Sequence, residues 1–264
     1  MTASARRPRP LSDADLSRLL ELTKHADSVE LKLTVLDTDV RSTVTGLGMD
    51  PLQAQIRQAF FFDTPDLRLD RQGVVLRARR IQGKGDDTVV KLRPVVPTEV
   101  PARLRDSPRM NVEVDAMPGG YVCSASLKGS PKPGAVQAAV AGALPLRKLF
   151  SKEQRAFFAD HAPDGLTMDD LSVMGPLTLL KLKFSPPDLA QRMVAELWFY
   201  PNATRILELS TKCPPTAAFQ VAAETRAWLA AQGVDLTGVQ QTKTRAALAY
   251  FSRALEQREA APAS

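Results

Sequence analysis

The chain has 264 residues, of which 44% are hydrophobic and 24% are charged, so it can bury a core as one domain or as two small ones. Its formal net charge of +6 favours an anionic partner, which composition leaves open as nucleic acid, a membrane surface or a phosphorylated small molecule. We expect a cytoplasmic protein without a membrane span or secretory signal, because no long apolar run occurs and Cys123 and Cys213 fit reduced thiols better than a disulfide framework.

The first predicted elements are a helix and a strand. Residues 11–26 carry leucines at helical spacing, and Ser12 or Asp13 can cap the helix. Residues 28–35, SVELKLTV, alternate aliphatic side chains with charged or polar ones. This alternation predicts a strand with one apolar and one charged face.

The most informative stretch is residues 73–94, GVVLRARRIQGKGDDTVVKLRP, which predicts two strands joined by a Gly-rich turn. Arg77 and Arg79 alternate with aliphatic residues in the first strand, and Lys91 and Arg93 do so in the second. Same-face side chains on neighbouring strands are within reach of one another, so four like charges repel. The hairpin therefore predicts a place where a polyanion binds.

The remaining elements follow from periodicity and from Gly and Pro residues. Further helices are predicted at residues 50–60, 135–143, 216–232 and 239–259. Further strands are predicted at residues 60–65, 111–116, 179–184, 193–200 and 205–212, while 121–128 fits a strand or a short connector. We expect one domain over residues 11–255, with a disordered tail at 1–10 and a flexible tail at 256–264.

The strands share an unusual composition, because the polar face of each carries mostly Arg, Lys and Glu. An open sheet with its charged face in water would also produce alternation. Ordinary surface strands, however, mix Thr, Ser and Gln with charges of both signs. A closed barrel, with an apolar exterior wrapped by helices and a charged lumen, accounts for both faces and is the predicted α+β architecture.

Five segments resemble the CYTH family, also called triphosphate tunnel metalloenzymes: SVELKLTV, FFDTPDLRLDRQGVVLRARR, VVKLRP, NVEVD and KEQRAFF. The resemblance runs from about residue 28 to residue 250. It implies an eight-stranded antiparallel β-barrel, or tunnel, that binds a triphosphate or a similar polyanion. Family activities include inorganic triphosphatase, thiamine-triphosphatase, RNA triphosphatase and class IV adenylyl cyclase, all with Mg²⁺ or Mn²⁺.

The resemblance also implies roles for individual residues. Glu30 and Lys32 match the last two letters of the family's first-strand Glu-x-Glu-x-Lys motif and are the candidate catalytic residues. The candidate phosphate-binding residues are Lys32, Arg77, Arg79, Lys91, Arg93, Arg155, Lys181 and Lys183. The candidate metal ligands are Glu30, Glu113, Asp115, Asp170 and Glu208.

The sequence departs from the family pattern where metal-binding acids are expected. Ser28 stands at the first Glu of the first-strand motif, and Lys181 and Lys183 are aligned with a late Glu-x-Glu pair. Mg²⁺ often takes only one or two protein carboxylates, with waters and phosphates completing its shell, so Glu30 and Glu113 can still hold one ion. Lys243, at the start of the last helix, is expected to be a helix-surface charge.

Three functional hypotheses follow. The first is a phosphohydrolase acting on inorganic triphosphate or a nucleoside triphosphate, with class IV adenylyl cyclase activity as an alternative. The second is an attenuated module that binds nucleotide or polyphosphate without turnover, which lysines in place of acids favour. The third, a nucleic-acid binder, is disfavoured because aromatic residues are not interleaved with basic ones. With only two histidines, the sequence also argues against a zinc site.

Overall fold

The computed structural model describes residues 11–238, 240 and 242–260, so the predicted tail at 1–10 and residues 261–264 lie outside the described residues. The strands are β1 (Ser28–Val35), β2 (Gln55–Asp63), β3 (Val74–Ile81), β4 (Asp87–Leu92), β5 (Met110–Met117), β6 (Gly120–Gly129), β7 (Ser172–Phe184), β8 (Met193–Phe199) and β9 (Arg205–Cys213). The helices are α1 (Asp13–Lys24), α2 (Val40–Gly46), α3 (Arg68–Arg71), α4 (Ala102–Arg105), α5 (Ala135–Val140), α6 (Leu146–Leu149), α7 (Lys152–Ala159), α8 (Ala218–Ala231) and α9 (Lys243–Ala260). Because α9 reaches Ala260, part of the predicted C-terminal tail is helical. None of the described helices is long and apolar enough to cross a membrane.

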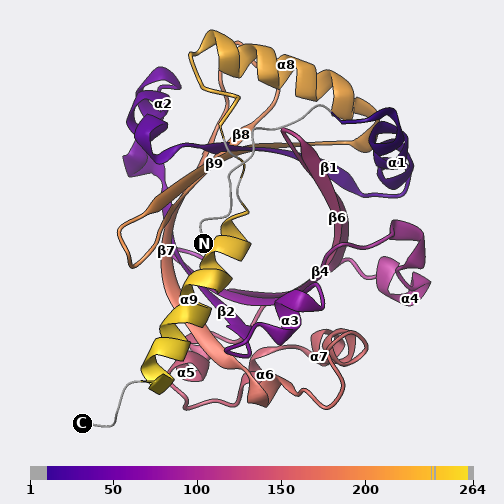
Figure 1. Cartoon of the computed structure of the whole chain (residues 1–264), viewed down its shortest axis with the longest axis vertical. Helices are drawn as coiled ribbons and strands as arrows, with labels where there is room; N and C mark the ends of the chain where they lie inside the picture. Colours follow the sequence, from indigo (N-terminus) through magenta and orange to yellow (C-terminus); the bar gives the residue numbers. More distant parts are fainter. Residues whose placement is uncertain (1–10, 239, 241, 261–264) are drawn as a thin grey trace.

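Within the described residues, nine strands close into a barrel in the order β1-β5-β6-β4-β3-β2-β7-β8-β9 (Figure 1). The α+β barrel is confirmed, but the expected count of eight strands is wrong. The segment that the sequence leaves open between strand and connector is β6, which pairs with both β4 and β5.

The expectation of an entirely antiparallel barrel is also wrong, because β1 and β5 run parallel while the other neighbouring pairs are antiparallel. This follows from the odd number of strands. Direction cannot alternate all the way around a closed ring of nine, so at least one pair must run parallel.

The predicted helix at residues 50–60 is wrong. A single turn of 3₁₀ helix at Pro51–Gln53 leads directly into β2. β2 lies between β3 and β7 and presents apolar side chains to both sides of the wall, Phe60 and Phe62 outward and Phe61 inward. A strand with two apolar faces lacks the alternation by which the other strands are found.

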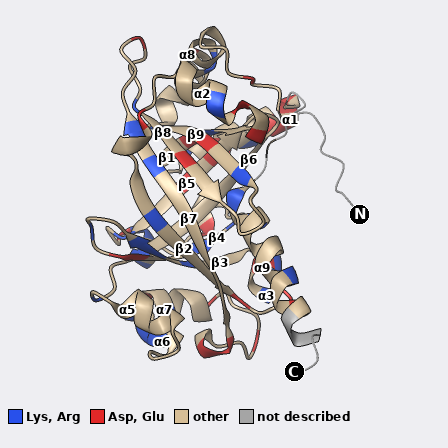
Figure 2. Cartoon of the chain, turned by 90° about the vertical axis from the view of Figure 1, so that its left-hand side faces the viewer, with Lys and Arg blue, Asp and Glu red and all other residues tan. Residues whose placement is uncertain are grey.

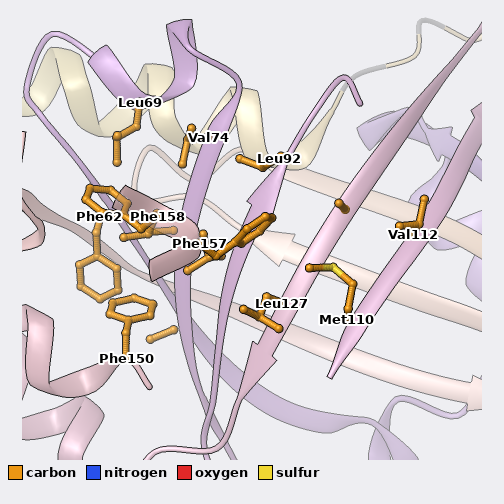
Figure 3. Close-up of a cluster of buried hydrophobic side chains, with 14 of the residues drawn as sticks. Phe62, Leu69, Val74, Leu92, Met110, Val112, Leu127, Phe150, Phe157 and Phe158 are labelled. Carbon is orange, nitrogen blue, oxygen red and sulfur yellow. The ribbon is translucent and has the colours of Figure 1, made fainter. Parts of the chain in front are cut away.

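The outer surface of the barrel is apolar and covered by helices, as predicted. Val74, Leu92, Val112 and other outward-facing aliphatic residues form the largest core cluster with residues of the covering segments, among them Phe157 of α7 (Figure 3). The outward faces therefore supply the hydrophobic core, and the inward faces are left for charged groups.

One hydrogen-bond network fixes α7 against the wall. Gln154 is fully buried and its side-chain amide donates to the Leu127 carbonyl at 3.0 Å. Its oxygen accepts from the Thr88 hydroxyl at 3.0 Å and from the backbone N–H of Ser151 at 3.1 Å. The network thereby ties the helix to β4 and β6 and satisfies a buried amide.

The C-terminal helix α9 lies over one end of the barrel (Figure 1). Ala247 and Leu248 are buried among inward-facing apolar residues, including Phe61 and Trp198. The Tyr200 hydroxyl donates to the carbonyl of Lys243 at 3.0 Å, which fixes the first turn of the helix. The start of α9 is therefore part of the interior of the barrel.

Candidate functional site

A cavity of about 780 Å³ runs inside the barrel. Charged positions lie midway along the strands that form its wall (Figure 2). Among the described residues, eleven cationic side chains line it: Lys32, Arg77, Arg79, Lys91, Arg93, Lys128, Lys181, Lys183, Arg192, Lys212 and Lys243. Six acids line it as well: Glu30, Asp87, Glu113, Asp115, Glu196 and Glu208. The excess of cations gives the lumen a net positive charge, which attracts anions.

Three of the acids form a cluster on β1 and β5. The parallel register sets Glu30 opposite Asp115 and Ser28 opposite Glu113. One oxygen from each of Glu30, Glu113 and Asp115 lies within 4.8 Å of the others, which is a spacing that one metal ion can bridge. Burial and the neighbouring carboxylates raise the pKa of Glu113. Ser28 donates to Glu113 at 3.2 Å, so it joins the cluster as a hydrogen-bond donor.

Lysines surround this acidic cluster. The Lys32 ammonium lies 2.8 Å from Asp115 and 3.2 Å from Glu30, and Lys91 lies 3.4 Å from Asp115. Burial disfavours the charged carboxylate, but the two lysines outweigh it and lower the pKa of Asp115 to about 2. Lys212 pairs with Glu113. The lysines therefore partly compensate the negative charge of the cluster.

Arg77 and Arg79 of β3 face the lumen in different states. Arg79 is paired with Asp87, with its Nε 2.9 Å from one carboxylate oxygen. Among the described residues, Arg77 has no ion-pair partner, and its buried Nε has no hydrogen-bond partner. Burial and then the charge of Arg79 lower the pKa of Arg77 to about 10. Arg77 thus directs a buried Nε donor at the cavity, and the acids that favour its charge, Asp87 and Glu196, form no ion pair with it.

A second charged cluster occupies β7, β8 and the start of α9. Glu196 and Glu208 are directly opposite in the β8–β9 register. The Lys243 ammonium lies between them, 2.5 Å from Glu196 and 2.7 Å from Glu208, while Lys181 lies 2.7 Å from the other oxygen of Glu196. The expectation that Lys243 is a helix-surface charge is wrong, because its side chain is 12% exposed.

Sequence reasoning missed Glu196 and misplaced Lys243 for different reasons. Glu196 lies on the inward face of β8, but its neighbours on that face, Val194 and Trp198, are apolar, so this strand lacks the charged face that identifies the other lumen residues. Lys243 carries no such signal, because a lysine in the first turn of a helix is ordinarily solvated. Only the packing of α9 into the barrel brings it inside.

Most of the predicted site residues line the cavity, which brings the first-strand, hairpin and mid-chain candidates together with Lys181, Lys183 and Glu208. Arg155 and Asp170, also predicted for the site, are not among the residues that line the cavity. Arg155 donates to the carbonyls of Arg147 and Phe150 at 3.2 and 2.8 Å, and Asp170 accepts from Thr167. Both lie in the segment between β6 and β7 that packs outside the barrel.

No family model matches this sequence, and no curated protein matches it. The fold, however, matches solved structures. A candidate adenylate cyclase from Bacillus halodurans gives a TM-score of 0.58 at 13% identity, with 83% of this chain and 97% of that chain covered. HpAC1 from Hippeastrum, a candidate adenylyl cyclase reported to have a dominant triphosphatase activity, gives 0.61 at 13% identity, with 84% and 95% covered. The chain therefore shares the overall fold of these two solved structures.

Proposed function

We propose that this protein is an enzyme that binds a triphosphate in its basic tunnel and hydrolyses it with one divalent ion, Mg²⁺ or Mn²⁺. The observation that carries the proposal is the buried Nε of Arg77 in the lumen, which has no hydrogen-bond partner among the described residues. A buried guanidinium without a partner is costly unless an anion completes its hydrogen bonds. The dominant triphosphatase activity of the Hippeastrum protein supports hydrolysis as the reaction.

The charge of the lumen fits a polyphosphate. Five of the lining cations have no carboxylate partner within 4 Å in the described part of the chain: Arg77, Arg93, Lys128, Lys183 and Arg192. Arginine donates two parallel hydrogen bonds to phosphate oxygens, while lysine supplies a compact point charge. These side chains lie on several strands, so a chain of phosphates can be contacted along its length.

The acidic cluster fits a divalent ion. Glu30, Glu113 and Asp115 offer oxygen ligands, which hard cations such as Mg²⁺ prefer, and their mutual repulsion is relieved by a cation. A bound ion would neutralise charge that develops on the phosphoryl oxygens. In this proposal Glu30 holds the ion and Lys32, which contacts both Glu30 and Asp115, orients the two carboxylates toward it.

Replacement of Glu113 by Gln tests the proposal. Wild-type protein is expected to release phosphate from tripolyphosphate with Mn²⁺ or Mg²⁺, and tripolyphosphate is expected to raise its Tm. Glu113→Gln should lose at least about 100-fold in turnover, since the ion acts mainly on the transition state, and should keep most of the Tm shift. Glu224→Gln, an exposed change on α8, is the matched control and should leave both readouts unchanged.

Two results would redirect the proposal. If tripolyphosphate raises the Tm but no divalent ion supports turnover, the protein is a module that binds polyphosphate without hydrolysing it. The ion pairs that Lys32 forms with Asp115 and Lys212 with Glu113 favour this alternative. Formation of cyclic AMP from ATP would establish the class IV cyclase alternative. If millimolar tripolyphosphate leaves the Tm unchanged, both the enzyme and the binding module are rejected.

A further inference from the structure

The Lys243 ammonium is held inside the barrel by groups from two strands. It contacts one oxygen of Glu196 and one of Glu208, and it lies 5.2 Å from the centre of the Trp198 ring. The indole N–H of Trp198 also donates to Glu196 at 3.3 Å. A lysine with two carboxylates and an aromatic face around it is fixed in place, because each contact favours the charged ammonium.

Two glutamates that face each other across neighbouring strands repel unless a cation lies between them. In many proteins with two opposed carboxylates that cation is a divalent metal ion. Here it is a side chain delivered by the C-terminal helix, whose first turn is fixed by the hydrogen bond from Tyr200. Lys181 binds the other oxygen of Glu196, so both oxygens of that carboxylate are engaged.

We infer that Lys243 is a resident cation that takes the place of a divalent ion between Glu196 and Glu208. Among the described residues, the acids left to hold a divalent ion are then Glu30, Glu113 and Asp115. That part of the inference rests on the proposed function. The exclusion at Glu196 and Glu208 does not depend on it.

The two acidic clusters differ in a way that supports this assignment. In the first, the lysine contacts are to Oε2 of Glu30 and Oε2 of Glu113, and one oxygen of each of the three acids lies within 4.8 Å of the others, which suits a metal ion. In the second, the ammonium already lies within 2.7 Å of both glutamates. Burial opposes ionisation, but Lys243 and Lys181 hold the pKa of Glu196 well below its ordinary value. A divalent ion entering there would meet two ammonium groups at close range.

The test counts Mn²⁺ ions bound per chain by electron paramagnetic resonance of the free ion, with no substrate present. Lys243→Met keeps the length of the side chain and removes its charge, and it is expected to bind one more Mn²⁺ than wild type. Lys183→Met is the matched control, because it removes a lumen lysine that has no carboxylate partner among the described residues. It should bind the wild-type number.

Further variants keep the inference falsifiable. Glu196→Gln with Glu208→Gln should leave the wild-type count unchanged, and adding both changes to Lys243→Met should abolish the extra ion. Mn²⁺ should raise the Tm of Lys243→Met more than that of wild type. Three outcomes would overturn the inference: an unchanged count in Lys243→Met, loss of an ion in the double glutamine variant, or a Lys243→Met protein that stays unfolded in millimolar Mn²⁺.

The results that would overturn the role of Lys243 differ from those that would overturn the proposed function. A wild-type protein that binds no Mn²⁺ would contradict the metal site at Glu30, Glu113 and Asp115. The gain of one ion in Lys243→Met would still support the resident cation in that case.

Discussion

Replacement of Arg77 by Met should make the ligand-free protein more stable while it impairs triphosphate binding. Burial and Arg79 lower the pKa of Arg77 from its ordinary value of 12.5 to about 10. At 1.36 kcal/mol per pKa unit, keeping this group charged costs the folded state about 3 kcal/mol. Methionine fills the space of the aliphatic stem without the charge, so the free energy of unfolding should rise by up to that amount.

The binding effect has the opposite sign. A hydrogen bond to a charged group contributes about 1.5–3 kcal/mol, so loss of the Arg77 contact should weaken tripolyphosphate binding roughly 10- to 100-fold. Urea denaturation measures the first quantity and isothermal titration calorimetry the second. Arg80→Met is the matched control, because Arg80 is exposed on the same strand and lies outside the cavity. Its change should stay within about 0.5 kcal/mol for stability.

The reasoning would be refuted by either of two results. If Arg77→Met is less stable than wild type, then the buried guanidinium is compensated in the ligand-free state. If it binds tripolyphosphate as wild type does, then the anion does not lie against β3.

Three further changes test the charge network and the packing. Burial opposes ionisation of Glu196, but Lys243 and Lys181 together outweigh it, so the folded pKa of Glu196 lies well below 4.5. The stabilisation from this carboxylate is present above pH 4.5 and is lost as pH falls through the folded pKa. Glu196→Gln should therefore cost about 3 kcal/mol at pH 7, with a Tm difference from wild type that shrinks in acid. Gly129→Ala should cost about 2 kcal/mol in urea denaturation, because the new Cβ would lie 2.4 Å from the Gln154 side-chain oxygen. Asp63→Ala should cost about 2–3 kcal/mol by the same measurement, since the buried carboxylate accepts three backbone N–H groups at 2.7–3.0 Å.

The lumen could be predicted from sequence wherever a strand has unlike faces. In β1, β3, β4 and β5 the alternation fixes which side chains share a face, so Lys32, Arg77 and Glu113 are placed correctly before any pairing is known. The same rule predicts that aliphatic residues such as Val74 lie on the outer side, where they are buried.

The errors occur where local pattern does not carry the information. β2 has apolar residues on both faces, so Phe60 and Phe61 give no alternation, and Pro51 favours a helix start instead. The parallel β1–β5 pair depends on how the ring closes, which is a property of the whole chain. Lys243 is placed by the docking of α9, and no spacing within the helix distinguishes it from a solvated lysine.

The barrel closes between its first and last strands, because β1 pairs with β9 and Val29 lies opposite Cys213. During synthesis β1 can therefore pair with β5 long before its second partner exists, and one edge of the unfinished sheet stays open. An open edge invites pairing with other chains, and inward-pointing charges are a common protection against it. Lys32, midway along β1, would oppose such pairing. The charges that shape the tunnel in the finished protein would thus also keep the nascent chain from aggregating before the ring closes.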